Sequence, residues 1–461
     1  MFPRPDPTGM SIHVEVLTRT LCDLGGVDRL EKLGQRGPLL ASAGASSLFH
    51  CLFGRDSIRM AQDLLEDFPA VARVTLLELA RLQGVVDNPR GEEEPGRILH
   101  EYRDPENPHA ARLVEVWDMP YFGAVDSTPQ WVNLLCSLCA RQASTDMLRE
   151  RVTDRLGHTV SLLQSLLRAV AWIVRRLDDP RGGGYLWVRR ASPRGIVNQV
   201  WEDSCDSYYH ADGRLFDPDR PYAPVHVQGY AYDALLGAAE LLQHAGAESS
   251  TSIAAHLRAL AARLRSQVLE AFWQADLGTF AQALTIESDA TAPRAARVVS
   301  SAPGHLLASR LLDGADAAGF REQLAWRLLQ SDLLCSAGVR TKSTTAARFR
   351  AGSYHNGSTW PMDTGIIADG LRRHGYTSQA DDLEQRMLLG CSQVGGFPEF
   401  FRGNEDEHVA VNVATVDAVV DGVSNRLEQP PQANQGWTAT RVWRILRARG
   451  AITPARMRRV R

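Results

Sequence analysis

The sequence predicts a mainly α-helical protein in which helical hairpins close into a ring. Apolar residues recur every three or four positions along most of the chain, as in amphipathic helices, whereas alternating, strand-like runs are few and short. The helices come in pairs, and the links between alternate pairs are long; loops of that length are usually functional. Six hairpins in a ring, with the long links gathered at one mouth, account for both observations.

The clearest helix is predicted between Ile253 and Phe272, where apolar side chains at 253, 257, 260, 264, 268 and 272 share one face. The same spacing predicts helices over residues 160–177, 227–244, 320–334, 379–389 and 437–446. Shorter candidates lie near residues 11–24, 55–66, 70–83, 128–142, 303–312 and 359–374. Only two strand-like runs stand out, YLWVRR at 185–190 and HVAVNVATV at 408–416.

The long links carry most of the unusual residues and are rich in Gly, Pro, Trp, Asp and His. They span residues 84–127, 178–226, 335–360 and 395–436. Neither a Gly/Ser-rich linker nor a low-complexity segment divides the chain, so we expect one domain over residues 1–461. Its core is expected over about residues 35–450, followed by a basic tail at 451–461 that is interpreted as a solvated terminus.

Composition narrows the class of protein. The 461 residues include 51 basic and 54 acidic side chains, and this balance argues against nucleic acid or a membrane surface as a partner. No run of 18 apolar residues and no signal-peptide pattern are found, so a cytoplasmic protein is expected. The seven cysteines are scattered and odd in number, against a disulfide framework. The C-x-x-C at 136–139 is interpreted as small residues on a helix face rather than a metal or redox site.

Six segments of the links combine carboxylates, aromatics, amides and glycine, which suits recognition of a sugar by hydrogen bonds and ring stacking. They are FGRDS at 53–57, GRILHEYR at 96–103, YFGAVDSTP at 121–129, GIVNQVWEDSCDSYYHADG at 195–213, YHNGSTWPMD at 354–363 and FPEFFRG at 397–403. A dinucleotide motif, a P-loop, a G-x-S-x-G elbow and zinc-ligand spacing are all missing from the sequence. We therefore expect no metal and no cofactor.

These segments, in this order, resemble the catalytic domain of bacterial glycogen-debranching amylo-α-1,6-glucosidases. More distantly the chain is similar to glucoamylases, neutral invertases and mannosylglycerate hydrolases, over roughly residues 35–450. The resemblance implies an all-α (α/α)6 barrel, a six-hairpin toroid, that hydrolyses a terminal α-glycosidic bond with inversion and without a cofactor, an α-glucosidic bond being the first expectation. Two patterns depart from it: W-P-H-D reads W-P-M-D at 360–363, and N-Q-G-W is read as N-Q-V-W at 198–201.

The same resemblance implies the catalytic pair. Inverting hydrolysis needs a protonated carboxyl for the leaving oxygen and a carboxylate that activates water, about 6.5–9.5 Å apart. Asp203 matches the general-acid segment, with Glu202 as the alternative. Glu399, which follows Pro398 in an aromatic setting, is the expected general base. A debranching enzyme of this type also carries an N-terminal β-rich domain; without one, small glycosides or oligosaccharides are expected to be better substrates than glycogen.

Ten further side chains besides Trp201 and Glu202 complete or flank the expected sugar site. Arg55 and Asp56 look like a clamp on the terminal sugar, since arginine donates and aspartate accepts hydrogen bonds from hydroxyls. For each tryptophan, packing in the core is as good an interpretation as stacking on substrate, and His355 and Asn356 are alternatively residues that order their loop. The predicted substrate-binding residues are Arg55, Asp56, His100, Glu101, Asp126, Trp201, Glu202, Gln228, His355, Asn356, Trp360 and Trp437.

Other functions use the same residues differently. A hydrolase of mannosyl- or glucosylglycerate needs a cation for the glycerate carboxylate, and Arg340, Lys342 and Arg402 lie in plausible loops. A sucrose-type hydrolase fits the same barrel. In an inverting phosphorylase, phosphate replaces the base and Glu399 is dispensable. A sugar-binding protein without activity would tolerate loss of both Asp203 and Glu399.

Overall fold

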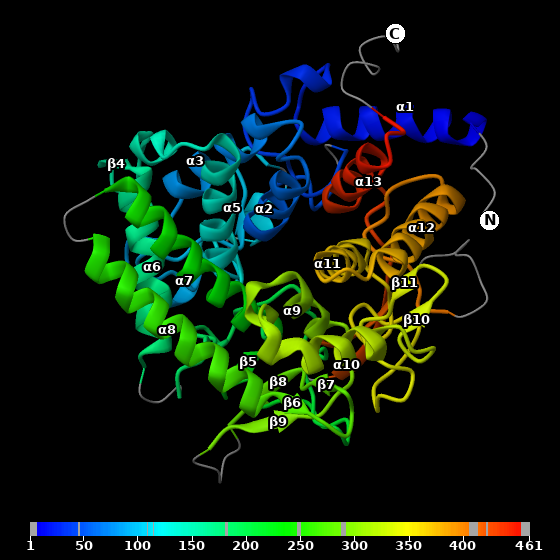
Figure 1. The fold of residues 1–461 in the computed structure, drawn as a ribbon. Helices are drawn as coiled ribbons and strands as arrows, with labels where there is room; N and C mark the ends of the chain where they lie inside the picture. The colour runs from blue at the N-terminus through cyan, green and yellow to red at the C-terminus, as the bar shows by residue number, and fades with distance from the viewer. Residues whose placement is uncertain are drawn as a thin grey trace.

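Helices dominate the structure, a computed structural model that describes residues 7–44, 47–107, 109–113, 115–179, 183–246, 250–286, 292–404, 414–420 and 423–452. The predicted mainly helical class is confirmed. Six helices form a closed ring, because each contacts the next and the last contacts the first. Figure 1 shows this ring nearly end-on, with the chain running once around it. The ring helices are α2 (Gly54–Asp63), α5 (Ser127–Gln142), α7 (Val225–Ala245), α9 (His305–Ala308), α11 (Pro361–Arg373) and α13 (Gly436–Ala448).

A second set of helices packs around the ring. Helix α3 contacts α2 and α5, α6 contacts α5 and α7, α8 contacts α7, and α12 contacts α11. Helix α1 contacts α13, where the ring closes on itself. Helix α10 packs beside the short helical turns around α9. These outer helices are α1 (Pro7–Leu24), α3 (Pro69–Arg81), α6 (Leu162–Leu177), α8 (Ser250–Ala271), α10 (Ala318–Leu328) and α12 (Thr377–Val394).

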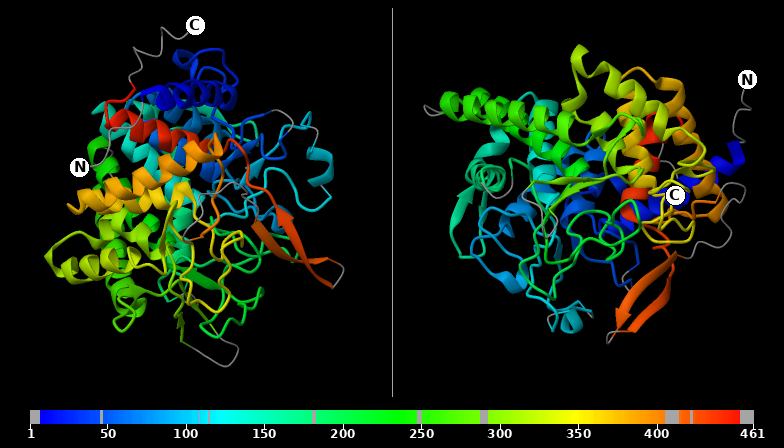
Figure 2. Two further views of the ribbon diagram at one scale, coloured as in Figure 1. Left: turned by 90° about the vertical axis from the view of Figure 1, so that its right-hand side faces the viewer. Right: turned by 90° about the horizontal axis from the view of Figure 1, so that it is seen from below.

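The strands are short antiparallel pieces in the links between helices. Strand β8 pairs with both β5 and β9, and the other strands form two-stranded pairs. The hairpin of β12 and β13 projects from the body of the molecule (Figure 2). The strands are β1 (Leu52–Phe53), β2 (Glu101–Tyr102), β3 (Arg151–Thr153), β4 (Thr159–Ser161), β5 (Tyr222–Pro224), β6 (Trp273–Gln274), β7 (Thr279–Phe280), β8 (Ala283–Thr285), β9 (Arg294–Ala296), β10 (Leu334–Cys335), β11 (Gly338–Val339), β12 (Ala414–Val420) and β13 (Val423–Gln429).

The first turns of the ring helices meet at one end of the ring. Arg55 in the first turn of α2 contacts Asp126, which directly precedes α5. Asp56 contacts Gln435, which directly precedes α13. At the start of α9, His305 contacts Asp363 in the first turn of α11. The links that carry the predicted sugar-binding segments lead into these helix starts.

Two predicted helices are shorter or more broken than their apolar pattern suggests. The helix expected over 320–334 ends at Leu328, because the carboxylate of Asp332 binds Arg327 at 2.8 and 2.6 Å and holds the chain in a turn. The helix expected over 303–312 is divided at Ser309, whose backbone is extended. The Ser309 hydroxyl accepts a hydrogen bond from Leu311 N and so starts a new helical turn.

The predicted strand at 185–190 is wrong in extent. Only Val188 forms a bridge, to Tyr222. The amide side chain of Gln228 accepts from Leu186 N and donates to Leu186 O, both at 2.9 Å, so these backbone groups are taken by a side chain instead of a strand. The other predicted strand spans 408–416, and its residues up to 413 lie outside the described part of the chain. Strand β12 begins at Ala414.

Three further expectations concern cysteines, membranes and the tail. Cys136 and Cys139 both lie on α5 and carry free thiols, and Cys136 packs against Gly237 where α5 meets α7. This agrees with the packing interpretation of the C-x-x-C. Among the described helices, none combines the length and the apolar character that crossing a lipid bilayer requires. Residues 453–461 of the basic tail lie outside the described part of the chain.

Candidate active site

Two short strands deliver the first group of predicted site residues. Strand β1 pairs with β2, so Phe53 lies opposite Glu101. Gly54 N donates to His100 O at 2.9 Å, and a Cβ on Gly54 would lie 2.1 Å from Leu99 O, a position that only glycine can fill. Arg55 and Asp56 therefore start α2 directly beside His100.

Arg55 is the centre of the site. Its Nη1 donates to both carboxylate oxygens of the fully buried Asp126, at 3.3 and 3.0 Å. Its Nη2 lies 3.8 Å from Asp203 Oδ2 and 3.5 Å from Nδ1 of His100. Burial keeps the pKa of His100 well below its usual value, so this imidazole is neutral. One buried cation thus faces two carboxyl groups from different links.

Asp203 is the accessible carboxyl of this group. Its side chain is 32% exposed, whereas that of Asp126 is fully covered. Desolvation raises the pKa of Asp203 to about 6 against the lowering effect of Arg55, and the negative charge of Asp126 raises it further. A carboxyl with this pKa holds its proton up to near-neutral pH and can donate it there.

Glu399 is held from two sides. The Tyr354 hydroxyl donates to Glu399 Oε1 at 2.5 Å, and Gln432 N donates to Oε2 at 3.1 Å. The residue is 5% exposed. Burial raises the pKa of Glu399 to about 7 in spite of these two donors, and the charges of Asp56 and Asp203 raise it further. Glu399, from the link before α13, is thus electrostatically coupled to both aspartates.

Asp56 completes what we call the carboxylate cluster: Asp56, Asp126, Asp203 and Glu399. Gln435 Nε2 donates to Asp56 Oδ1 at 3.0 Å. Burial raises the pKa of Asp56 to about 7, with Arg55 opposing the shift. Several carboxyl groups with pKa values near neutrality in one place are the arrangement expected where protons are exchanged with a substrate.

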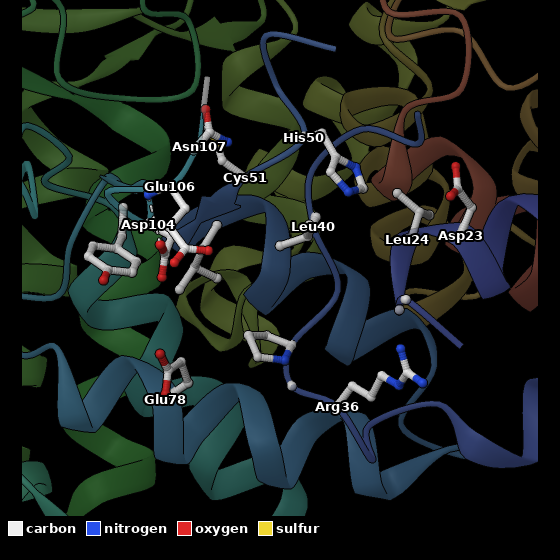
Figure 3. A pocket seen from close by; sticks show the side chains of 16 residues that line it. Asp23, Leu24, Arg36, Leu40, His50, Cys51, Glu78, Asp104, Glu106 and Asn107 are labelled. Atoms are coloured by element: carbon white, nitrogen blue, oxygen red, sulfur yellow. Dashed lines mark hydrogen bonds between the residues drawn. The ribbon is translucent and has the colours of Figure 1, made fainter. Parts of the chain in front are cut away.

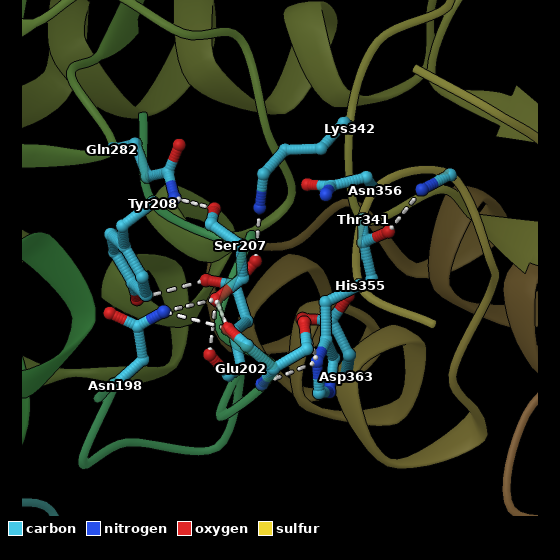
Figure 4. A network of polar contacts seen from close by, with 12 residues as sticks. Asn198, Glu202, Ser207, Tyr208, Gln282, Thr341, Lys342, His355, Asn356 and Asp363 are labelled. Atoms are coloured by element: carbon cyan, nitrogen blue, oxygen red, sulfur yellow. Dashed lines mark hydrogen bonds and ion pairs between the residues drawn. The ribbon is translucent and has the colours of Figure 1, made fainter. Parts of the chain in front are cut away.

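Glu202 lies outside the carboxylate cluster. It is fully buried in an ion pair with Lys342, and the Tyr208 hydroxyl donates to its Oε2 at 3.0 Å. Figure 4 shows Lys342 and Tyr208 both directed at Glu202. The expectation that Glu202 binds substrate does not agree with this placement, because its carboxylate is fully buried and bound by these two side chains. The same ion pair removes Lys342 from the candidate ligands of a glycerate carboxylate.

The buried ion pair of Glu202 and Lys342 leads to a prediction about stability. Lys342→Met leaves the Glu202 carboxylate buried without its counter-charge, and we expect a loss of about 3–5 kcal/mol in the free energy of unfolding, measured by urea denaturation. Replacing both partners by apolar residues, Glu202→Leu with Lys342→Met, should recover most of the loss, because no buried charge remains. Equal stability of the single variant and the native chain would contradict the pairing.

Five predicted substrate ligands, two of them tryptophans, pack behind the cluster instead of facing it. The side-chain amide of Gln228 is hydrogen-bonded to the backbone of Leu186 and Pro224. His355 Nδ1 lies 2.9 Å from Ser204 Oγ, and Asn356 donates to Asp206 O at 3.0 Å, so both order the link that carries Asp203. The fully covered residues of this group are Gln228, His355 and Asn356, with Trp360 at 1% and Trp201 at 3% exposure.

The tryptophans form a buried aromatic layer. The Trp360 ring stacks on His355 at 4.8 Å, and its indole N–H donates to Tyr354 O and Ser358 Oγ. Trp201 and Trp437 meet Trp360 edge to face at 5.8 and 5.7 Å. Of the two interpretations, packing in the core therefore holds for Trp360 and Trp201. Trp437 is 5% exposed at the start of α13, and its indole nitrogen has no hydrogen-bond partner in the described structure.

Glu101 lies near a cavity of about 520 Å³ that the end of α1 helps to line, and Figure 3 shows that cavity. It forms an ion pair with Arg103, and the thiol of Cys51, which lines that cavity, lies 3.9 Å from its Oε1. Burial raises the pKa of Glu101 and is opposed by Arg103. Glu101 is therefore neutralised within the protein and supports the wall behind His100.

Three side-chain or backbone partners of the cluster were missed from the sequence: Tyr354, Gln432 and Gln435. Tyr354 directly precedes His355 in the predicted segment and could have been included with it. Gln435 stands in an intact N-Q-G-W at 434–437, so reading this pattern at 198–201 was wrong. Gln432 contacts Glu399 through its backbone N–H and not through its side chain, so the sequence carries no signal for this contact.

The described residues contain no group of three or more His, Cys, Asp or Glu side chains that could hold a metal ion. The cluster instead pairs its carboxylates with Arg55, Tyr354, Gln435 and a backbone N–H. These are hydrogen-bond donors for oxygen acceptors. The arrangement can hold hydroxyl groups and move protons with the side chains that it contains.

Solved structures with the same fold are known. The chain superimposes on the family 63 mannosylglycerate hydrolase from Thermus thermophilus in complex with Tris and D-glycerate with a TM-score of 0.62, at 15% identity, over 95% of this chain and 100% of that one. The complex of the same enzyme with glucose gives a TM-score of 0.59 at 16% identity, over 94% and 99% of the two chains. No curated protein matches the chain by sequence.

The family comparison is more specific. The model of the mannosylglycerate hydrolase MGH1-like glycoside hydrolase domain matches residues 143–410. This segment contains Asp203 and Glu399 and makes up more than half of the 461 residues. The resemblance to mannosylglycerate hydrolases is confirmed, and the chain belongs to the MGH1-like family of glycoside hydrolase domains.

Proposed function

We propose that the protein hydrolyses the glycosidic bond of a small glycoside whose aglycone carries a carboxylate, a hexosylglycerate being the leading candidate. The observation that carries the proposal is the carboxylate cluster in a chain of the MGH1-like family. A structural relative that is a mannosylglycerate hydrolase and binds D-glycerate supports this substrate class. The scaffold is proposed to be a single (α/α)6 barrel over residues 1–461, in which the ring and the outer helices are the two layers.

In the proposed reaction Asp203 is the general acid and Glu399 the general base. Asp203 donates its proton to the glycosidic oxygen as the bond from that oxygen to the anomeric carbon breaks. Glu399 accepts a proton from water, whose oxygen forms the new bond on the opposite face of the sugar, so the configuration inverts. Tyr354 and Gln432 N hold the Glu399 carboxylate in place, and Arg55 keeps Asp203 oriented.

Recognition of a carboxylate aglycone needs a cation that the protein does not already neutralise. Arg340 is fully buried and donates to the carbonyl oxygens of Ser331, Leu334 and Gly403. With Lys342 held by Glu202, neither of these two cations is open to an aglycone. Arg402 is half-buried, and its guanidinium lies against Gly352.

Hydrolysis of an α-glucoside is the second candidate, and the glucose complex of the structural relative favours it. A debranching, amylo-α-1,6-glucosidase activity belongs to this candidate. The two differ in the aglycone: a hexosylglycerate offers a carboxylate, whereas maltose-sized glucosides and glycogen offer neutral hydroxyls. A cation at the aglycone position improves the binding of a hexosylglycerate but not that of a neutral glucoside.

The test is a substrate panel with the anomer of the released sugar followed by proton NMR. We expect turnover of mannosyl- or glucosylglycerate above that of maltose, sucrose and glycogen, without added phosphate, and an initial β-anomer from an α-linked substrate. An initial α-anomer excludes the inverting mechanism, a requirement for phosphate indicates a phosphorylase, and a preference for maltose selects the second candidate.

A further inference from the structure

The opposite end of the ring contains a second cavity, which we call the central cavity. Its volume is about 570 Å³, within the range of sites for small organic ligands. All six ring helices contribute to its lining, and so does the turn that follows α9. Most of these residues lie beyond the first turn of their helix, for example Gln62 in α2, Cys136 in α5 and Arg373 in α11.

Buried side chains separate the central cavity from the carboxylate cluster. Tyr230 and His305 line it, and the Tyr230 hydroxyl lies 2.5 Å from His305 Nδ1. His305 Nε2 lies 2.7 Å from Asp363 Oδ1, at the start of α11. Burial lowers the pKa of His305 to about 3, so its imidazole is neutral. The wall between the two sites therefore adds no cation to the cavity.

The rim of the cavity carries arginines that are already paired. Arg310 binds Glu240 at 3.0 and 2.7 Å, and Arg373 binds Asp313 at 3.1 and 2.6 Å. Arg444 binds Asp369 at 2.9 Å. The arginine side chains in these three pairs are 40% exposed, so the rim is in contact with solvent. Their charges are balanced by carboxylates.

Arg59 is different. It lines the central cavity from α2, and within the described part of the chain it has neither a hydrogen-bond nor an ion-pair partner. Its charge helps to lower the pKa values of His305 and Asp369, which also line the cavity. The remaining carboxyl of the lining, Asp233, accepts a hydrogen bond from Arg310 N, and burial raises its pKa to about 7. Among the described residues, Arg59 is thus an arginine of the lining to which no carboxylate is directly bonded.

We propose that the central cavity binds a small organic anion, with Arg59 gripping its phosphate or carboxylate group. Arginine presents donors in a planar fork that matches either group. The amides of Gln62 and Gln130 and the hydroxyl of Ser137 also line the cavity and offer donors and acceptors for hydroxyl groups of the ligand. Since 570 Å³ is far more than one anionic group fills, the ligand is expected to carry a polar body of about monosaccharide size.

The proposal is tested by isothermal titration calorimetry with glucose 6-phosphate and with glucuronate as probes, and with glucose as the neutral comparison. The native chain should bind at least one anionic probe saturably, and the stronger of the two identifies phosphate or carboxylate as the preferred group. Arg59→Gln should weaken that binding about ten- to a hundredfold, because a charge-assisted hydrogen bond is lost. Arg149→Gln, which changes an arginine that is 84% exposed and outside the cavity, should bind like the native chain.

Two results would overturn the proposal. One is the absence of saturable binding of both anionic probes by the native chain. The other is equal affinity in the native chain and in Arg59→Gln, which would place the ligand elsewhere, for instance at the carboxylate cluster. If Arg59→Gln does not fold, Gln62→Glu provides the same test, since it keeps the arginine and sets a negative charge against the anion. Native-like affinity of Gln62→Glu would equally refute the site.

Discussion

Asp203→Asn is expected to lower kcat on the best hexosylglycerate or glucoside about 10²–10⁴-fold, with little change in KM. The amide keeps the shape of the side chain but has no proton to give to the leaving oxygen, and general acid catalysis typically contributes this much. A glycosyl fluoride needs almost no protonation to leave, so this variant should regain much of its rate on that substrate. Asp212→Asn, an exposed change in the same link, is the control and should keep native activity.

The pH profile of kcat/KM gives a second readout of the same variant. With pKa values of about 6 for Asp203 and about 7 for Glu399, protons leave the two carboxyls in two steps near neutrality, and the profile should be bell-shaped there. Activity rises with pH as the first proton leaves and falls as the second leaves. In Asp203→Asn the alkaline fall should disappear. The rise should remain and should then reflect the titration of Glu399 alone.

Glu399→Gln is also expected to lower kcat about 10²–10⁴-fold, but this variant should respond differently to an activated leaving group. The amide cannot accept a proton from water, and this step is needed whatever the leaving group is. A glycosyl fluoride should therefore not restore activity, in contrast to Asp203→Asn. Glu322→Gln, at an exposed position on α10, is the control. Substantial turnover by Glu399→Gln with added phosphate would reveal a phosphorylase, and full activity of both main variants would refute the assignment of the catalytic pair.

The helical architecture could be predicted because it depends on local periodicity. The helix expected over 227–244 is observed as α7 from Val225 to Ala245, and the one expected over 253–272 as α8 from Ser250 to Ala271. Failures occurred where a side chain far away in sequence competed for the backbone. Gln228, 42 residues from Leu186, takes the hydrogen bonds that a strand at 185–190 would need.

The composition of the site could be predicted better than its orientation. The segments that meet at the ring were recognised by residue type, but adjacent residues of one segment face opposite ways. Asp203 is 32% exposed beside Arg55, while Glu202 next to it is fully buried with Lys342. That choice depends on a partner 140 residues further along the chain. The bond of Gln435 to Asp56 spans 379 residues and has no local signature except an intact N-Q-G-W.

The convergence of helix starts at one end of the ring has an electrostatic consequence. Each α-helix carries partial positive charge at its N-terminus, and α2, α5 and α13 all begin beside the carboxylate cluster. Several fixed macrodipoles therefore oppose the mutual repulsion of four carboxyl groups that Arg55 alone does not neutralise. Because these dipoles belong to the closed ring, they do not have to reorient when the general acid loses its proton. The framework that closes the ring also supplies a preorganised field for the reaction.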